Sequence, residues 1–247
     1  MKMKIAIVLA MFVLPLTALR AQNFHFWDGI ETFDGPTSEN PLMASQLDLY
    51  FDKMVAPLPD SITLEISRLI DRTENNTDLR DFILWHLLEK YSHPEYMSQD
   101  QVFVWLYDHY FSQLEIKGLN EYNLTLIQKK AERLRRLALF NIAPDIKIND
   151  TFVLQSVESE YTVLFFFDHS CEICLEEKQE LDSVCALHPE ITVLRIDLNM
   201  EPPTDPNEIA AVFDTYDIES KPLIYVLDRE KRIIAKKIRA RQIPLIM

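Results

Sequence analysis

The spacing of apolar residues changes at about residue 140. Between Leu42 and Leu139 apolar residues recur at intervals of three and four, which is the period of amphipathic α-helices. The clearest stripes are Phe82, Trp85, Leu88 and Tyr91 on one segment, and Val102, Phe103, Leu106, Tyr107 and Tyr110 on another. We interpret them as the core-facing sides of a helical bundle, with a binding groove as the alternative. The sequence therefore predicts an all-α domain over residues 42–140.

The last helix of that domain is expected from Glu121 to Phe140, and its second half is basic. Cations suit the C-terminal half of a helix because the backbone dipole is negative there. We interpret these side chains as a solvated face rather than a partner site: Lys129, Lys130, Arg133, Arg135 and Arg136.

Beyond Pro144 short β-type runs alternate with helical stretches. The runs are Phe152–Leu154, Tyr161–Phe167, Ile191–Asp197, Leu223–Leu227 and Ile233–Ile238, and the last two form a hairpin across residues 228–231. Helices are expected at Cys171–Leu187 and at Pro206–Tyr216, the second with Asp205 as its N-cap. We predict an α+β chain in which the helical domain precedes an α/β domain over residues 141–247, built on a mixed central sheet flanked by helices.

The first residues have the pattern of a secretory signal peptide. Lys2 and Lys4 precede an apolar run from Ile5 to Leu14 that is too short to span a bilayer, and small residues follow up to Ala21. We expect cleavage after residue 21, an irregular segment over residues 22–41, and a periplasmic location with no integral membrane segment after cleavage.

Charge excludes one class of partner. The chain has a net charge of −14, and loss of three of its 25 basic residues with the signal peptide leaves 22 against 39 acidic ones, a net charge of −17. Because phosphate binding needs a basic surface, a nucleic-acid partner is disfavoured.

The candidate chemistry lies where the apolar run Phe165–Phe167 ends in a polar turn and two cysteines follow, Cys171 and Cys174. A cysteine at a helix N-terminus meets unpaired backbone N–H groups, which stabilise its thiolate, and a second cysteine one turn later can reach the same sulfur. We favour a redox-active pair over a purely structural disulfide. Leu175 stands where c-type haem attachment would need histidine, and Ser170 is a candidate cap for the helix.

A zinc site is a further alternative, because Cys185 and His188 repeat the spacing of the first pair. One continuous helix would separate Cys174 from Cys185 by about 16 Å, which one ion cannot bridge. Cys185 is most simply a buried apolar residue. His169 could stabilise a thiolate when protonated, although an exposed turn histidine is the simpler interpretation. We expect no metal and no cofactor.

The residues from Ala143-Pro144-Asp145 to about residue 238 resemble the thioredoxin superfamily, in the secreted branch similar to TlpA and ResA proteins. Cys171-Glu172-Ile173-Cys174 matches its CxxC motif, and Ser220-Lys221-Pro222-Leu223 lies where the family has a proline, usually cis, opposite the dithiol. The helical region resembles a domain of secreted Bacteroidota proteins, mainly through residues 96–110. Phe165 replaces the buried aspartate that many thioredoxins have six residues before the first cysteine.

The resemblance implies a thioredoxin-like fold over 141–247 and a protein thiol-disulfide oxidoreductase. Cys171 would attack a client disulfide and Cys174 would resolve the product. Glu177 matches an acidic residue credited with managing the thiol protons, and Lys221 and Pro222 would face the client. Partners would be client proteins and a redox partner whose identity, like the direction of exchange and the oligomeric state, the sequence leaves open. The alternative is a secreted binding module in which this domain is a scaffold and the helical domain binds a partner.

Overall fold

The computed structural model describes residues 26–27, 41–148, 151–199 and 206–247. The predicted signal peptide over residues 1–21, most of the predicted irregular segment over 22–41, and the expected N-cap Asp205 lie outside these residues. Trp27 is buried and its ring lies 4.9 Å from that of Tyr50 in the first described helix.

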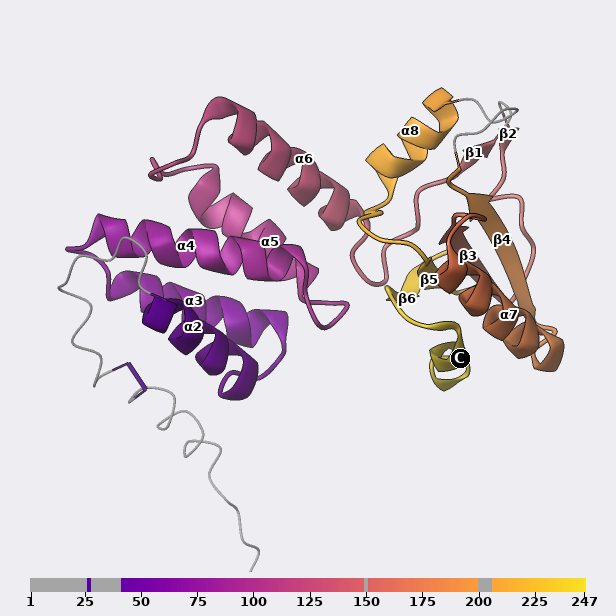
Figure 1. Cartoon of the computed structure of the whole chain (residues 1–247), viewed down its shortest axis with the longest axis horizontal. Helices are drawn as coiled ribbons and strands as arrows, with labels where there is room; N and C mark the ends of the chain where they lie inside the picture. The colour runs from indigo at the N-terminus through magenta and orange to yellow at the C-terminus, as the bar shows by residue number, and fades with distance from the viewer. Residues whose placement is uncertain (1–25, 28–40, 149–150, 200–205) are drawn as a thin grey trace, which may run out of the picture.

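Helices make up the described chain from Pro41 to Arg136, here called the helical region (Figure 1). They are α2 (Pro41–Lys53), α3 (Pro59–Asp71), α4 (Thr77–Ser92), α5 (Asp100–Leu106), which continues as the π-helical turn η2 (Tyr107–Phe111), and α6 (Glu121–Arg136). Asn76 and Asn120 cap α4 and α6, because each side-chain oxygen accepts a hydrogen bond from a first-turn N–H.

The predicted aromatic stripes do face the core of the helical region. Leu88 and Tyr91 of α4, like Val102, Phe103 and Leu106 of α5, are buried, and the remaining stripe residues pack partly buried against them. Burial of this continuous apolar face is what holds short helices in place.

The last helix ends earlier than the sequence predicted, at Arg136 instead of Phe140. Phe140 has a φ of 68°, which the α-helix does not allow, and its N–H donates to the Ile233 carbonyl at 2.8 Å. The chain therefore leaves the helix in order to pair with the sheet.

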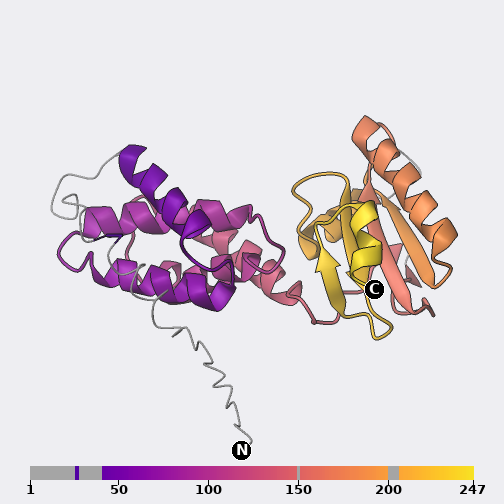
Figure 2. The ribbon, with the colours of Figure 1, turned by 90° about the horizontal axis from the view of Figure 1, so that it is seen from below.

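The rest of the chain, here called the sheet region, contains a small hairpin and a four-stranded sheet (Figures 1 and 2). The hairpin joins β1 (Lys147–Ile148), which the sequence did not indicate, to β2 (Thr151–Phe152). The sheet and its helices follow in the order β3 (Tyr161–Phe167), α7 (Glu172–Leu187), β4 (Ile191–Asp197), α8 (Pro206–Thr215), β5 (Leu223–Leu227), β6 (Ile233–Lys236) and the 3₁₀-helix η3 (Ala240–Leu245).

The strands lie in the order β4-β3-β5-β6, with β4 parallel and β5 antiparallel to β3, and β6 antiparallel to β5. The predicted fold class, an all-α part followed by an α/β part with a mixed sheet, is confirmed. The four long predicted strands are present, although the last ends at Lys236 rather than Ile238.

Both faces of the sheet are covered, which explains why β3 is apolar throughout. Its odd-numbered residues, such as Phe165, pack in a cluster with residues of α7 and η3, whereas Leu164 and Phe166 pack in a second cluster with residues of α8. A central strand buried on two sides has no place for alternating polar residues. This strand ends at Phe167, four residues before Cys171.

Ion pairs join the two regions. Lys236 of β6 and Asp100 at the start of α5 are in contact, and both side chains are almost completely buried.

The basic end of α6 is not simply solvated, which corrects the interpretation from sequence. Lys130 contacts Glu219, and Arg133 lies 3.4 Å from Asp217, so both cations bind the loop between α8 and β5.

Candidate functional site

The two cysteines of the CxxC motif lie where β3 gives way to α7. Cys171 is the N-cap residue of α7, and its Sγ accepts a hydrogen bond from the Cys174 N–H at 3.3 Å. The sulfur therefore occupies the position of a capping oxygen, next to backbone donors that the helix leaves unpaired. Ser170, the expected cap, instead donates its hydroxyl to Asp168 at 2.6 Å.

The two thiols differ in accessibility and in chemistry. All three cysteines of the chain are free, and Cys171 is half-buried whereas the Cys174 side chain is completely enclosed. Burial, together with the hydrogen bond to Cys171, raises the pKa of Cys174 to about 11. Cys174 is consequently a protonated thiol near neutral pH, and Cys171 is the sulfur that another molecule can reach.

Asp168 organises the turn before the dithiol, a role that the sequence analysis missed. Its Oδ1 accepts hydrogen bonds from the N–H and hydroxyl of Ser170, and its carbonyl oxygen accepts one from the Cys171 N–H at 3.1 Å. An aspartate that bonds the N–H two residues later is an ordinary turn signal, so the Asp-His-Ser sequence could have indicated it.

Lys221 and Pro222 lie beside this turn because β5 pairs with β3. Leu223 is the register partner of Phe166, which brings the start of β5 next to the end of β3. The Lys221–Pro222 peptide bond is cis, as the family resemblance led us to expect. The Lys221 Nζ donates to Asp168 Oδ2 at 2.7 Å. Its charge is therefore paired with a carboxylate of the turn before the dithiol, and the expectation that Lys221 and Pro222 face a client stays a prediction.

The hydrogen bonds to Asp168 also affect its acidity. Those from Lys221 and Ser170 hold the pKa of the Asp168 carboxyl well below its usual range. Asp168 thus stays a carboxylate at any pH near neutrality.

Glu177 is buried although it is a charged residue of helix α7. Its Oε2 accepts a hydrogen bond from the Arg239 guanidinium at 2.9 Å, and its Oε1 accepts one from the Ala240 N–H at 2.5 Å. Both oxygens therefore bind the segment that leads into η3. The contacts give Glu177 an anchoring role, and a role in thiol proton transfer stays a prediction.

His169 is exposed and points to the neighbouring strand. Its Nδ1 lies 2.7 Å from Asp197 Oδ2 and its Nε2 lies 3.0 Å from Asn199 Nδ2. In the described part of the chain, Asp168, His169 and Asp197 form a group whose ligand-type atoms lie within 4.8 Å of one another. Hydrogen-bond and ion-pair partners already occupy these atoms, and the Lys221 ammonium on Asp168 would repel a cation.

The spacing that suggested zinc does not assemble a site. Helix α7 runs unbroken from Glu172 to Leu187, so Cys174 and Cys185 lie about 16 Å apart along its axis. His188 contacts Glu190 at 3.0 Å. Cys185 is half-buried against the core cluster next to α7, and burial raises its pKa. It therefore belongs to the packing of α7.

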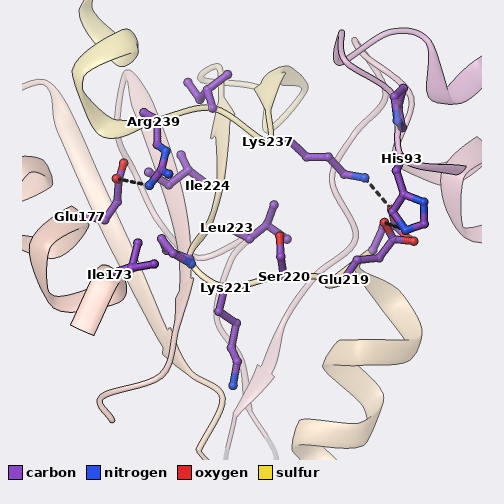
Figure 3. Close-up of a pocket in the computed structure, with 14 residues that line it drawn as sticks. His93, Ile173, Glu177, Glu219, Ser220, Lys221, Leu223, Ile224, Lys237 and Arg239 are labelled. Atoms are coloured by element: carbon purple, nitrogen blue, oxygen red, sulfur yellow. Dashed lines mark hydrogen bonds and ion pairs between the residues drawn. The ribbon is translucent and has the colours of Figure 1, made fainter. Parts of the chain in front are cut away.

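A cavity of about 380 Å³ adjoins the dithiol at Ile173, the residue between Glu172 and Cys174 (Figure 3). Pro222 and its neighbours form one side of it and the segment Lys237–Arg239 forms another. His93 and Pro94, from the loop between α4 and α5, complete the lining. The cavity thus lies between the sheet region and the helical region.

Comparison with solved structures shows which fold this is. A thioredoxin-like protein from Bacteroides caccae superposes with a TM-score of 0.71 at 16% sequence identity, over 97% of this chain and 95% of that one. The chain has a thioredoxin-like fold. The likeness covers the helical region as well, so the complete two-part architecture recurs in that protein.

Two further structures match less than half of the chain. A domain of a possible thiol-disulfide isomerase from Cytophaga hutchinsonii has 27% identity and a TM-score of 0.36, over 44% of this chain and 89% of that one. The thioredoxin domain of a thiol-disulfide oxidoreductase from Bacteroides vulgatus has 18% identity and a TM-score of 0.39, over 45% of this chain and 99% of that one.

Comparisons of sequence alone found nothing: no protein-family model and no curated protein matches the chain. Among the described residues, no helix is both long enough and apolar enough to cross a membrane. The thioredoxin-like fold is therefore established by structure, and the chemistry has to be argued from the site.

Proposed function

We propose that this protein is an extracytoplasmic thiol-disulfide oxidoreductase of the TlpA- and ResA-like type, which exchanges disulfides with client proteins through Cys171 and Cys174. One observation carries the proposal: an accessible sulfur at a helix N-terminus, with a fully buried thiol one turn behind it. The thioredoxin-like fold supports it, and the signal-peptide pattern of residues 1–21 supports the location.

In the reductive direction the Cys171 thiolate attacks one sulfur of a client disulfide. The client S–S bond breaks, its other sulfur leaves as a thiolate that takes a proton from water, and a mixed disulfide joins Cys171 to the client. The N–H of Cys174, already directed at Cys171 Sγ, stabilises negative charge on that sulfur.

Cys174 then completes the exchange. Its thiol loses a proton, and the resulting thiolate attacks Cys171 Sγ and displaces the second client sulfur. Two electrons have passed from the dithiol to the client, and the protein carries a Cys171–Cys174 disulfide that an external dithiol must reduce. Because the pKa of Cys174 is about 11, resolution is the step in which this site has to remove a proton.

Removing the resolving sulfur tests the proposal. Full-length Cys174→Ser should accumulate disulfide-linked complexes with extracytoplasmic proteins, and dithiothreitol should separate these complexes. Cys171→Ser should form none. The double variant is the control, since loss of the complexes on adding Cys171→Ser assigns the bond to Cys171. Empty non-reducing gels for both single variants, together with no reduction of insulin disulfides by the wild type, would favour a scaffold with a binding role instead.

A further inference from the structure

The cavity beside Ile173 contains a wall that the thioredoxin-like part does not supply. His93 and Pro94 belong to the helical region, and they face a cavity whose other residues come from α7, the loop before β5, the start of β5 and the segment after β6. Figure 3 shows His93 and Glu219 at one end, and Glu177 with Arg239 at the other. The volume of about 380 Å³ lies in the range of sites that hold a ligand group.

The charged groups around this cavity are paired with one another. Arg239 binds Glu177 at 2.9 Å, and Lys237 binds Asp217 at 2.8 Å. Glu219 contacts Lys130, and His93 Nε2 lies 3.5 Å from its second oxygen. Because a charged ligand would have to compete with these internal pairs, the cavity offers it no free counter-charge among the described lining residues.

The remaining lining is largely apolar. Ile173 is 54% exposed although it is a large aliphatic residue, and it faces the cavity together with Pro94, Pro222 and Ile238. An exposed apolar side chain next to a reactive sulfur favours an apolar contact with whatever binds there. A polypeptide joined to Cys171 would pass Ile173 within about one or two residues of its own cysteine.

Contacts elsewhere hold the helical wall of the cavity in position. The Asp100–Lys236 pair fixes the start of α5, six residues after Pro94, to β6, and Lys130 connects the Ser92 carbonyl to Glu219. The His93–Pro94 loop is thus placed by polar contacts on both of its sides. Its position is part of the fold rather than a consequence of binding.

From these observations we infer that the cavity is a client subsite, completed by the His93–Pro94 loop, that takes an apolar side chain flanking the client's cysteine. The inference rests on the proposed function for its substrate. It gives the helical region a specific part in the protein, because Pro94 then helps to determine which client sequences are exchanged quickly.

The test uses the full-length protein without its signal peptide and three disulfide-linked peptides that carry Leu, Gly or Asp next to the cysteine. We expect the wild type to reduce the Leu peptide with a kcat/KM at least about tenfold above that for the Asp peptide, as burial of one aliphatic side chain allows. Pro94→Asp should remove this preference. Ser220→Trp, which fills the cavity from the sheet side, should remove it too, so the result does not depend on one variant folding well. Pro57→Asp, at an exposed proline of the helical region, is the matched control and should keep the preference.

A measurement without redox chemistry separates this inference from the proposed function. Peptides with Ser in place of Cys should shift the amide NMR signals of Ile173 and Arg239 when they carry Leu but not when they carry Asp, and Pro94→Asp should abolish the shifts. If the protein reduced no disulfide but these NMR shifts were still observed, the proposed function would be wrong and the subsite inference would still hold. Reduction that shows the same Leu-to-Asp ratio in the wild type and both cavity variants would overturn the subsite, as would shifts confined to other surfaces.

Discussion

Lys221 and Asp168, 53 residues apart in the sequence, form an ion pair of 2.7 Å that joins the two loops flanking the dithiol. Hydrogen bonds from Lys221 and Ser170 stabilise the charged form of the carboxylate, so the pKa of Asp168 lies well below its usual range. A carboxyl with a lowered pKa stabilises the folded state above its unfolded pKa, and that contribution is lost as the pH falls through the folded value.

We therefore predict that Asp168 of the wild type is still ionised at pH 3, and that Lys221→Met raises the pKa of Asp168 toward the value of about 3.9 for a free side chain. Carboxyl ¹³C NMR titration measures both. Lys129→Met, at an exposed lysine of α6, is the control and should leave Asp168 unchanged. A pKa of about 3.9 for Asp168 in the wild type would contradict the pairing with Lys221.

The difference between the two sulfurs predicts selective alkylation. At pH 8 iodoacetamide should modify Cys171 of the native, reduced protein at least about tenfold faster than Cys174, because Cys174 is enclosed and protonated at that pH. Peptide mapping by mass spectrometry gives both rates. Equal rates would mean that Cys174 is not enclosed in solution.

The raised pKa of Cys174 also predicts how stability changes with pH. Between the unfolded pKa of about 8.5 and the folded value of about 11, the unfolded chain loses the Cys174 proton while the folded chain keeps it, so stability falls as the pH rises. The free energy of unfolding of reduced wild type should fall relative to Cys174→Ala by at most about 1.4 kcal/mol per pH unit. Urea unfolding at pH 8.5 to 10.5 measures these free energies. If the free energy of unfolding changed with pH equally in the wild type and in Cys174→Ala, this prediction would be refuted.

Glu177 is expected to hold the C-terminal segment. Glu177→Gln removes the ion pair with Arg239 and should cost about 1–3 kcal/mol, because Arg239 and the buried amide lose a charged acceptor. Trypsin should then cleave faster after Arg239 and Arg241. Glu176→Gln, on an exposed neighbouring side chain, is the matched control. A variant with normal protease resistance but a shifted pH profile of insulin reduction would assign Glu177 to proton transfer instead.

The buried pair of Asp100 and Lys236 should couple the helical and sheet regions. Either Asp100→Asn or Lys236→Met leaves a buried charge without its partner and should cost about 3–5 kcal/mol. Asp100→Asn combined with Lys236→Met should cost clearly less than the sum of the two single changes in a double-mutant cycle. Additive costs in urea unfolding would show that the two side chains act independently.

Cys185 is expected to contribute packing only. Cys185→Ala should reduce stability by about 1 kcal/mol through lost buried volume and leave insulin reduction unchanged. Elemental analysis of wild type and variant checks the alternative, since zinc bound to the wild type and lost from the variant would restore the metal hypothesis.

Local sequence determined the elements that carry the dithiol. The apolar run of β3, the polar turn and the helical period of α7 are all contained in residues 161–187. The spacing of Cys171 and Cys174 also places both sulfurs on one helical turn. Such features can be predicted because the pattern of residues that marks each of them lies within one short stretch of the chain.

The surroundings of the dithiol depended on residues far away in the sequence. Glu177 is buried because Arg239, 62 positions later, returns to it, and Lys130 is drawn from solvent by Glu219, 89 positions later. The spacing of residues in neither helix indicates such a partner. A single charged residue on a helix is expected to be solvated unless the fold places an opposite charge beside it. Residues from four parts of the chain likewise enclose the cavity beside Ile173. The sequence by itself therefore determined which cysteines form the candidate dithiol. Only the tertiary structure decided which charges are paired and which residues line the cavity beside it, because both depend on contacts that folding alone brings together.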